Sequence, residues 1–444
     1  MITLYVNNFR GFKDTYIPLK DVNFFVGENS TGKTSILSLI ELLSNSDFYE
    51  QCDFRSKSGF DLGHFQELTT ESYFDVGFYR NNISDERNDE DILSFMPSFI
   101  ARFVADDDNA PVISKLIFDF DSFVASLQVK NRKRNIKILN EINKTGVDRF
   151  QLLLKEHNSQ KSVGYKMFDE KGYNEHLEKN NGYFTSIQGA RFAVILNISK
   201  LDIPHNIKAP LSRLFNNLRF QNLVWISPIR SKPERTYDRR SREYSPEGKH
   251  IPYILLDIEE KGEKKGKDLT HSMNRFGKES GLFNSVHAKK FGDEKNAPFE
   301  IQIEIDNDSH RKITNVGYGV SQALPIVIEI LSRIKNTFFA IQQPEVHLHP
   351  KAQAAVGEFI HNQVIESNHK FVIETHSDFM IDRFRIAQRK SRNKVTSQVV
   401  YFERTQQGNK LICLELDENG LYPDNQPESF REFFMNEAMA LLEM

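Results

Sequence analysis

The chain has 444 residues, more than one hydrophobic core usually serves, so its length predicts two lobes or a core domain with an insertion. Hydrophobic residues make up 39% and charged residues 27% of the chain, which excludes wholesale disorder. A formal net charge of −3 gives no support to nucleic-acid binding through bulk charge, so any such surface has to be local.

Cysteine usage and hydropathy indicate a cellular compartment. Cys52 and Cys413 lie far apart and form no CxxC motif, which argues against a disulfide framework or a thiolate zinc site and fits a reducing cytosol. The N-terminus lacks the pattern of a signal peptide, and no apolar run reaches the length of about 18 residues that spans a membrane. We therefore expect a cytoplasmic protein without a membrane partner.

The N-terminal part predicts strand, turn, strand, loop and helix, in that order. Ile2 to Val6 is a short β-rich run, and Val22 to Val26 is apolar except for Asn23, as expected of a buried strand. Ser35 to Leu43 carries apolar residues at helical spacing. The loop between this strand and this helix contains the first functional motif.

That loop, Gly27 to Thr34, has the sequence GENSTGKT and matches the phosphate-binding pattern GxxxxGK[ST]. Its glycines let backbone N–H groups approach phosphate, Lys33 supplies a cation to the β and γ phosphates, and the Thr34 hydroxyl ligates Mg²⁺. The following helix N-terminus adds partial positive charge. A surface glycine loop with an incidental lysine is disfavoured by the flanking strand and helix. The predicted ATP-binding residues here are Gly27, Asn29, Ser30, Thr31, Gly32, Lys33, Thr34 and Ser35.

The interval 71–222 mixes short β-like runs with long polar stretches, and we interpret it as an inserted, mainly helical arm. A linker from Ser227 to Pro252 then leads into a strand–helix series that continues to the C-terminus. The expected division is 1–70 and 223–444 for the two parts of one core domain, with the insertion between them.

Three segments of the C-terminal part place polar motifs at the ends of apolar elements. The segment 315–322 (NVGYGVSQ) opens an apolar helix, and small residues at a helix N-terminus suit a phosphate contact. The segment 338–350 (FFAIQQPEVHLHP) is an apolar strand followed by polar residues, where a Walker B motif belongs. The segment 371–377 (FVIETHS) is a second buried strand with a histidine after its carboxyl end.

In this order, the segments NNFRGF, GENSTGKTS, GHFQEL, VGYGVSQALP, QQPEVHLHP and IETHSD resemble the ABC-class ATPases of the SMC/RecF/OLD branch. They look most similar to the stand-alone, AAA-type ATPase subunits of anti-phage systems such as Septu, PARIS and some retrons. The resemblance covers residues 1–70 and 223–444. It implies an α/β P-loop NTPase fold of the two-lobed ABC-ATPase head type, with ATP and Mg²⁺ as cofactors.

The resemblance also implies roles for single residues. Gln66 would be the Q-loop residue that contacts nucleotide and Mg²⁺, beside Thr34. Gly319, Ser321 and Gln322 would form the signature segment, which reaches the γ-phosphate of ATP held by a second protomer.

Two further segments complete the motif set. His376 would be the switch histidine at the γ-phosphate, and His347 to Pro350 would be the D-loop at a dimer seam. These roles imply a homo-oligomer whose minimum unit is a head-to-tail dimer with two ATP molecules at its interface.

The chain departs from the family at the strand-end positions of the usual Walker B acids, which are Gln342 and Gln343. The first acid usually orients Mg²⁺ through water, and the second polarises the attacking water. A glutamine amide can hydrogen-bond that water but cannot accept its proton or hold the metal by charge. We keep Gln342 in the predicted Mg²⁺ site and take Gln343, Glu345 and His376 as the catalytic residues. Either hydrolysis is slow or partner-stimulated, or Glu345 or Glu374 supplies the acid.

Other residues invite weaker interpretations. His347 and His349 have a spacing that suggests a metal site, but only Glu345 nearby could join them, so a packed or interface role is favoured. Asp119 and Asp121 form a DxD pattern found in nucleases, but no Glu-Gly strand turn precedes it, so we interpret it as a solvated strand end.

Two basic clusters are the nucleic-acid candidates. The alternatives are a solvated charged face, or a set of arginines that reaches nucleotide or effector. The first comprises Lys130, Arg132, Lys133, Arg134 and Lys137, and the second comprises Arg230, Lys232, Arg235, Arg239, Arg240 and Arg242 with Tyr237 and Tyr244.

Three functional classes compete. The favoured class is an ATP-dependent sensor-scaffold of an anti-phage defence system that controls a separate effector nuclease of HNH or TOPRIM type. The alternative is a DNA-clamping ATPase of repair or chromosome maintenance, but 71–222 lacks the sustained heptads of a long coiled-coil arm. A self-contained nuclease-ATPase is disfavoured because too few residues follow His376 for a TOPRIM domain.

Overall fold

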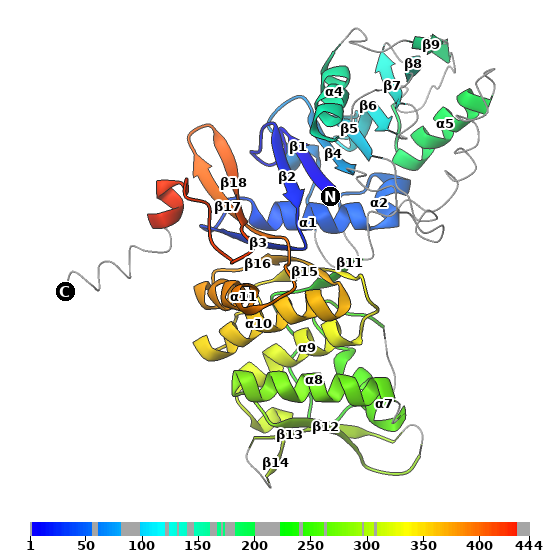
Figure 1. Ribbon diagram of the computed structural model, residues 1–444. Helices are drawn as coiled ribbons and strands as arrows, with labels where there is room; N and C mark the ends of the chain where they lie inside the picture. Colours follow the sequence, from blue (N-terminus) through cyan, green and yellow to red (C-terminus); the bar gives the residue numbers. More distant parts are fainter. Residues whose placement is uncertain are drawn as a thin grey trace. The chain divides into compact units, whose positions relative to one another are not determined.

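The computed structural model divides the chain into two compact units, which Figure 1 shows coloured along the sequence. Unit 1 comprises 1–19, 30–222 and 403–411, and unit 2 comprises 20–29, 223–402 and 412–444. The described residues are 2–55, 61–80, 98–119, 124–130, 133–139, 146–159, 167–169, 172–173, 183–199, 223–238, 243–261, 264–294, 297–305 and 309–432. Every helix in these ranges is too short or too polar to cross a membrane.

Unit 2 is built on a six-stranded sheet in the order β11-β15-β16-β3-β17-β18, of which the first five strands are parallel to their neighbours. Strands such as FFAIQ and KFVIE are nearly continuous apolar runs, as expected where helices or other strands cover both faces. The strands are β3 (Val22–Gly27), β11 (Leu223–Ile226), β15 (Phe338–Gln342), β16 (Lys370–Glu374), β17 (Ser397–Thr405) and β18 (Gly408–Leu416).

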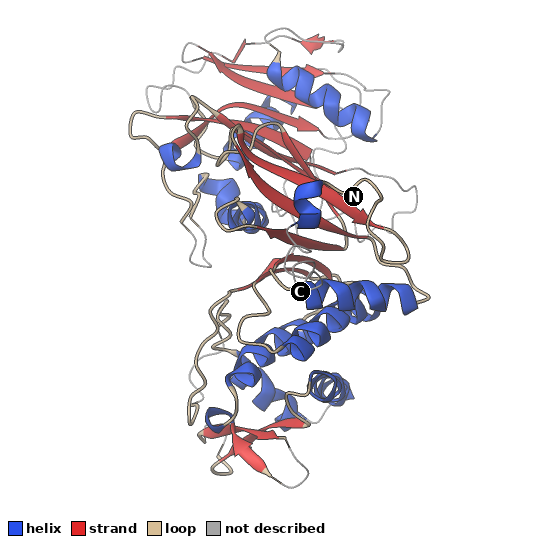
Figure 2. Cartoon of the chain, turned by 90° about the vertical axis from the view of Figure 1, so that its left-hand side faces the viewer, coloured by secondary structure: helices blue, strands red, loops and turns tan. Residues whose placement is uncertain are grey.

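The helices of unit 2 pack on this sheet and on one another. In Figure 1, α10 lies against α11 and α8, and α9 lies against α7 and α8. A small three-stranded sheet packs against α7 and α8 (Figure 2). The elements are α7 (Ile251–Lys261), α8 (Lys264–Ser280), α9 (Tyr318–Ser332), α10 (Pro350–Ser367), α11 (Asp378–Lys390), η4 (Ile313–Asn315), β12 (Ser285–Lys290), β13 (Phe299–Glu304) and β14 (His310–Lys312).

Unit 1 contains a nine-stranded sheet in the order β10-β8-β7-β6-β5-β4-β1-β2, with β9 also paired to β8. Its strands are β1 (Ile2–Asn7), β2 (Thr15–Leu19), β4 (Phe74–Arg80), β5 (Ser98–Ala105), β6 (Pro111–Asp119), β7 (Val124–Lys130), β8 (Lys133–Leu139), β9 (Met167–Asp169) and β10 (Gly172–Tyr173). Its helices are α1 (Lys33–Ser44), α2 (Ser46–Gln51), α3 (Phe65–Leu68), α4 (Gly146–Asn158) and α5 (Ile187–Ser199).

The α/β class expected from the sequence is confirmed, but the mainly helical insertion is wrong for the described residues. Between 71 and 222 these residues form strands β4 to β10 and only the two helices α4 and α5. These strands are rich in β-branched and aromatic residues, whose preference for a pleated sheet outweighs the polar residues among them. Because β1 pairs with both β2 and β4, the N-terminal strands and the expected insertion share one sheet.

An ion pair holds α4 to the strands of unit 1. The Arg149 guanidinium donates to both carboxylate oxygens of Asp119, at 2.6 and 2.5 Å, and both side chains are buried. Asp119 is therefore neither a solvated strand end nor a nuclease ligand, because its two oxygens accept from Arg149. Asp121, the second residue of the DxD pattern, lies outside the described residues.

A second buried acid, Asp75 of β4, joins four elements of unit 1. Its oxygens accept from Nε and Nη2 of Arg102 at 2.7 and 2.9 Å and from Asn7 Nδ2 at 3.2 Å, and His157 Nε2 of α4 lies 3.1 Å away. Burial raises the pKa of Asp75, but the hydrogen bonds from His157 and Arg102 outweigh it and lower that pKa to about 2. The carboxylate is thus held in its charged form.

We predict that Asp75→Asn lowers the free energy of unfolding of unit 1 by about 3 kcal/mol at neutral pH, because Arg102 loses its buried counter-charge. The folded pKa lies below the unfolded value of about 3.9, so the contribution is complete above that value and disappears as the pH falls through about 2. Urea unfolding at pH 7 and pH 3 measures this. The exposed Asp108→Asn is the control, and equal stability of the two variants at pH 7 would contradict the prediction.

Candidate nucleotide site

The phosphate loop lies between β3, which ends at Gly27, and α1, which begins at Lys33. Gly27 and Gly32 have φ values of 140° and 93°, in the region that favours glycine. A Cβ at Gly27 would lie 2.2 Å from the Phe402 carbonyl oxygen, and one at Gly32 would lie 2.5 Å from the Phe12 ring. Both glycines are therefore required by the backbone path as well as by the motif.

The residues around the start of α1 differ in exposure. Lys33 and Thr31 are buried, whereas Thr34 is exposed and Ser35 is half-buried. Gly32 is the N-cap of α1 and has no side chain that could occupy the cap position. The first turn of the helix thus presents its N-terminus without a competing cap, as phosphate-binding loops do.

Gln66 lies in the short helix α3, and its side chain is exposed. The segment around it is held by Arg10, whose backbone N–H donates to the Leu68 carbonyl oxygen at 2.7 Å and whose Nη2 donates to that of Leu62 at 2.6 Å. Asn409 Nδ2 in turn donates to the Arg10 carbonyl oxygen at 2.9 Å. Side-chain and backbone hydrogen bonds through Arg10 therefore hold the segment that carries Gln66, and its Q-loop role stays a prediction.

The strand ends of unit 2 bring Gln342, Gln343 and Glu374 together. Gln342 and Glu374 are register partners on β15 and β16, and Gln342 Nε2 donates to Glu374 Oε2 at 3.1 Å. Gln343 follows with φ of 45°, and its N–H donates to the Glu374 carbonyl oxygen at 2.8 Å. The left-handed backbone of a non-glycine residue is kept only where surrounding contacts hold it.

Glu345 is engaged by the loop that carries the predicted switch histidine. Its Oε2 accepts from the Thr375 hydroxyl at 2.8 Å, and its Oε1 accepts from the His376 N–H at 2.7 Å. Burial raises the pKa of Glu345, and the hydrogen bonds from His376 and Thr375 oppose that shift. The His376 side chain is exposed, and its backbone N–H is held by Glu345. Glu345 therefore positions His376.

Arg230 is a site residue whose role the sequence interpretation missed. Its Nη1 donates to the carbonyl oxygens of Gln343 and Pro228, and its Nη2 donates to that of Gln342, each at 3.2 Å. Burial lowers the pKa of Arg230 to about 10, and Glu345 opposes this shift. Arg230 is only 3% exposed, so it clamps the end of β15 and does not face nucleic acid.

The predicted signature and D-loop segments meet within unit 2. A Cβ at Gly319 would lie 3.3 Å from the His347 carbonyl oxygen, and the Tyr318 and His347 rings meet edge to face at 4.9 Å. Ser321 and Gln322 lie in the first turn of α9, but both side chains are buried, and the Ser321 hydroxyl donates to the Tyr318 carbonyl oxygen at 2.8 Å. Their role in a signature segment stays a prediction.

His347 and His349 have the packed roles that the sequence analysis favoured over metal binding. The His349 side chain caps α10 by accepting from the Ala352 N–H, and His347 packs on Tyr318. Across the described ranges, no group of three or more His, Cys, Asp or Glu side chains could hold a metal ion. Mg²⁺ would fit as an ion shared with nucleotide phosphates, because the Thr34 hydroxyl is an oxygen ligand of the kind it prefers.

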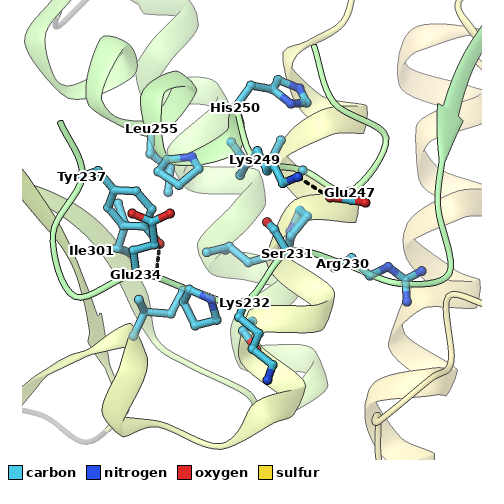
Figure 3. Close-up of a pocket in the computed structure, with 18 of the residues that line it drawn as sticks. Arg230, Ser231, Lys232, Glu234, Tyr237, Glu247, Lys249, His250, Leu255 and Ile301 are labelled. Carbon is cyan, nitrogen blue, oxygen red and sulfur yellow. Dashed lines mark hydrogen bonds and ion pairs between the residues drawn. The ribbon is translucent and has the colours of Figure 1, made fainter. Parts of the chain in front are cut away.

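A cavity of about 580 Å³ in unit 2 lies between the segment that begins at Ile229 and the start of α9 (Figure 3). Lys249 and Glu247 form an ion pair at 2.8 Å in its wall, and Ser321 also lines it. In Figure 3 the Arg230 guanidinium points away from the other labelled side chains. Because phosphate-loop residues are not among its lining, this cavity is not the nucleotide site.

The second basic cluster is largely structural where it is described. Tyr237 is buried and stacks on Phe299, and the Tyr244 hydroxyl donates to the Trp225 carbonyl oxygen. Lys232 and Arg235 are exposed and stay candidates for nucleic-acid contact. Arg239, Arg240 and Arg242 lie outside the described residues, as do Arg132 and the side chains of Lys130, Lys133 and Arg134 in the first cluster; Lys137 is half-exposed on β8.

The comparison with protein families decides the class. The model of the AAA ATPase domain family AAA_15 matches residues 1–381. The chain belongs to this family. This AAA ATPase is therefore expected to use ATP and, as is usual for the class, Mg²⁺.

Solved structures of SMC head domains are similar to this AAA ATPase at low identity. An SMC head bound to the C-terminal winged-helix domain of ScpA shares 12% identity, with 94% of this chain and 98% of that chain covered and a TM-score of 0.41. The SMC head domain from Thermotoga maritima shares 10%, with 93% and 98% covered and a TM-score of 0.36. An SMC head with an extended coiled coil, bound to the C-terminal domain of ScpA from Pyrococcus furiosus, shares 12%, with 100% and 99% covered and a TM-score of 0.36. The comparison with curated proteins gave no match.

We predict that Arg230→Lys lowers the free energy of unfolding of unit 2 by about 2 kcal/mol, because an ammonium group cannot span the three carbonyl oxygens that the planar guanidinium reaches. Urea unfolding measures the loss, and ATP turnover should fall as the end of β15 loosens. Exposed Lys232→Arg is the matched control. A variant as stable as the wild type would show that the guanidinium does not clamp this strand.

We also predict that Glu345→Gln frees the backbone around His376. The amide offers one acceptor oxygen in place of two, so either Thr375 or His376 loses its acceptor, at a cost of about 1–3 kcal/mol. Hydrogen exchange of the His376 amide should accelerate roughly tenfold or more. Unchanged exchange would refute the positioning role, and exposed Glu366→Gln should leave this amide as it is.

Proposed function

We propose that this AAA ATPase is an ATP-driven sensor-scaffold of a bacterial anti-phage defence system, which assembles as a homo-oligomer and controls a separate effector nuclease. The observation that carries the proposal is the pair of glutamines, Gln342 and Gln343, at the end of β15. Two amides at this place favour a protein that stays closed around ATP over one that turns it over quickly.

The phosphate loop supports ATP binding by residues of this chain. Lys33 and the backbone N–H groups at the start of α1 would hold the phosphates, and Thr34 would contribute to holding Mg²⁺. Bound Mg²⁺ would neutralise phosphate charge. The Gln343 amide can orient a water molecule, but it cannot take up the water's proton, so the chain lacks a general base at this position.

Exposed residues in the predicted interface motifs support an assembly of two protomers. Tyr318, at the start of the predicted signature helix, is 46% exposed, and His347 and His376 are exposed as well. These three residues belong to the motifs that would meet a second protomer. A head-to-tail dimer would cover them, and closure of that dimer on ATP would be the signal passed to the effector.

The experiment is mass determination of the purified protein with and without Mg-ATP, with ATP turnover measured in the same samples. We expect ATP-dependent assembly with turnover below about 1 per second, slow beside the roughly 10 per second of a typical enzyme. Lys33→Ala should abolish ATP binding and assembly, and exposed Lys335→Ala should retain both.

Turnover at tens per second, by a protein whose mass is the same with and without Mg-ATP, would refute the proposal that the protein stays closed around ATP. Stimulation of turnover by duplex DNA in the absence of an effector would instead favour the DNA-clamping class. Loss of phage resistance in cells that carry Lys33→Ala, with a neighbouring nuclease gene present, tests the defence role directly.

A further inference from the structure

The acid that is missing from β15 has a counterpart on the neighbouring strand. Glu374 is the last residue of β16, and its register partner is Gln342, the last residue of β15. Glu374 is only 3% exposed, and its Oε2 accepts from Gln342 Nε2 at 3.1 Å. The strand ends therefore hold one carboxylate and one amide side by side, with the carboxylate on β16.

The sheet order brings that carboxylate closer to the phosphate-loop strand. β16 lies between β15 and β3, and Glu374 is in register with Phe25 of β3. The N–H of Thr375, the next residue, donates to the Phe25 carbonyl oxygen at 3.1 Å. β3 continues directly into the phosphate loop at Gly27. Ligands of parallel sheets bind at the carboxyl ends of the strands. Glu374 lies at such an end on β16, the strand next to β3, whereas Gln342 lies on β15, one strand further from β3.

We propose that Glu374 is the acid of the Mg-ATP site in this protein, in place of the strand-end acid expected at Gln342. The proposal rests on ATP binding as proposed above. Mg²⁺ prefers oxygen ligands and keeps several of its waters, so a buried carboxylate can hold it through a water molecule. The ion would also supply a counter-charge to a carboxylate in a low-dielectric environment. Gln342 then positions Glu374 by its amide hydrogen bond.

Glu345, the other available acid, is less suited to this role. Each of its oxygens already accepts a hydrogen bond, one from Thr375 and one from His376. Turning either oxygen toward a metal ion would release the loop that carries His376. Glu345 is therefore a positioning residue for that loop, and Glu374 is the metal-site residue.

The test is metal binding by Glu374→Gln, a change that keeps the size of the side chain and removes its charge. Mn²⁺ affinity is measured by electron paramagnetic resonance with a non-hydrolysable ATP analogue, and ATP-analogue affinity is measured separately in EDTA. We expect Mn²⁺ affinity to fall about 10–100-fold while analogue affinity in EDTA stays unchanged. Exposed Glu366→Gln is the matched control and should alter neither.

An exchange variant, Gln342→Glu with Glu374→Gln, restores one carboxylate and one amide with the strands reversed. We expect it to recover most of the lost Mn²⁺ affinity, and it carries the test if Glu374→Gln alone does not fold. Wild-type Mn²⁺ affinity in a folded Glu374→Gln, or no recovery in the exchange variant, would overturn the proposal. Failure of the wild type to bind the analogue in EDTA, as well as with metal, would instead refute the proposed ATP-binding function.

Discussion

Hydrogen bonds between the ends of β15 and β16 hold the candidate site in place. Gln342 and Gln343 contact Glu374 through a side chain and a backbone N–H, and Arg230 binds the carbonyl oxygens of the same two glutamines. These contacts stabilise the left-handed backbone at Gln343, which a non-glycine residue adopts only at a cost. Without these hydrogen bonds, Gln342, Gln343 and Glu374 would have no defined position at the carboxyl ends of the strands.

The carboxyl ends of these strands also position the predicted switch histidine, His376. Glu345 follows Gln343 by two residues and accepts from Thr375 and His376, so the loops after β15 and β16 are joined by side chain as well as by sheet pairing. Arg230 and Glu345 influence each other electrostatically, which brings the segment after β11 into the same group. A change in one strand end is therefore expected to reach the others through short, buried contacts.

Unit 1 uses its buried charges for a different purpose. Asp119 with Arg149, and Asp75 with Arg102 and His157, connect α4 to the strands beneath it. These pairs partly account for the polar residues between 71 and 222, which suggested a mainly helical arm. These charges hold a β-rich unit together.

The sequence by itself determined the α/β class, the phosphate loop and the order of the ATPase motifs, because these depend on local patterns. A buried strand, a glycine loop and a helix follow one another within the residues from Val22 to Ser44. Only the tertiary structure showed the partners of Arg230, Glu345 and Glu374. Their partners come from strands and loops far apart in the chain, and strand order in a sheet cannot be obtained from the composition of each strand. The strands of 71–222 also needed their neighbours, since a strand is stabilised by cross-strand pairing more than by its own residues.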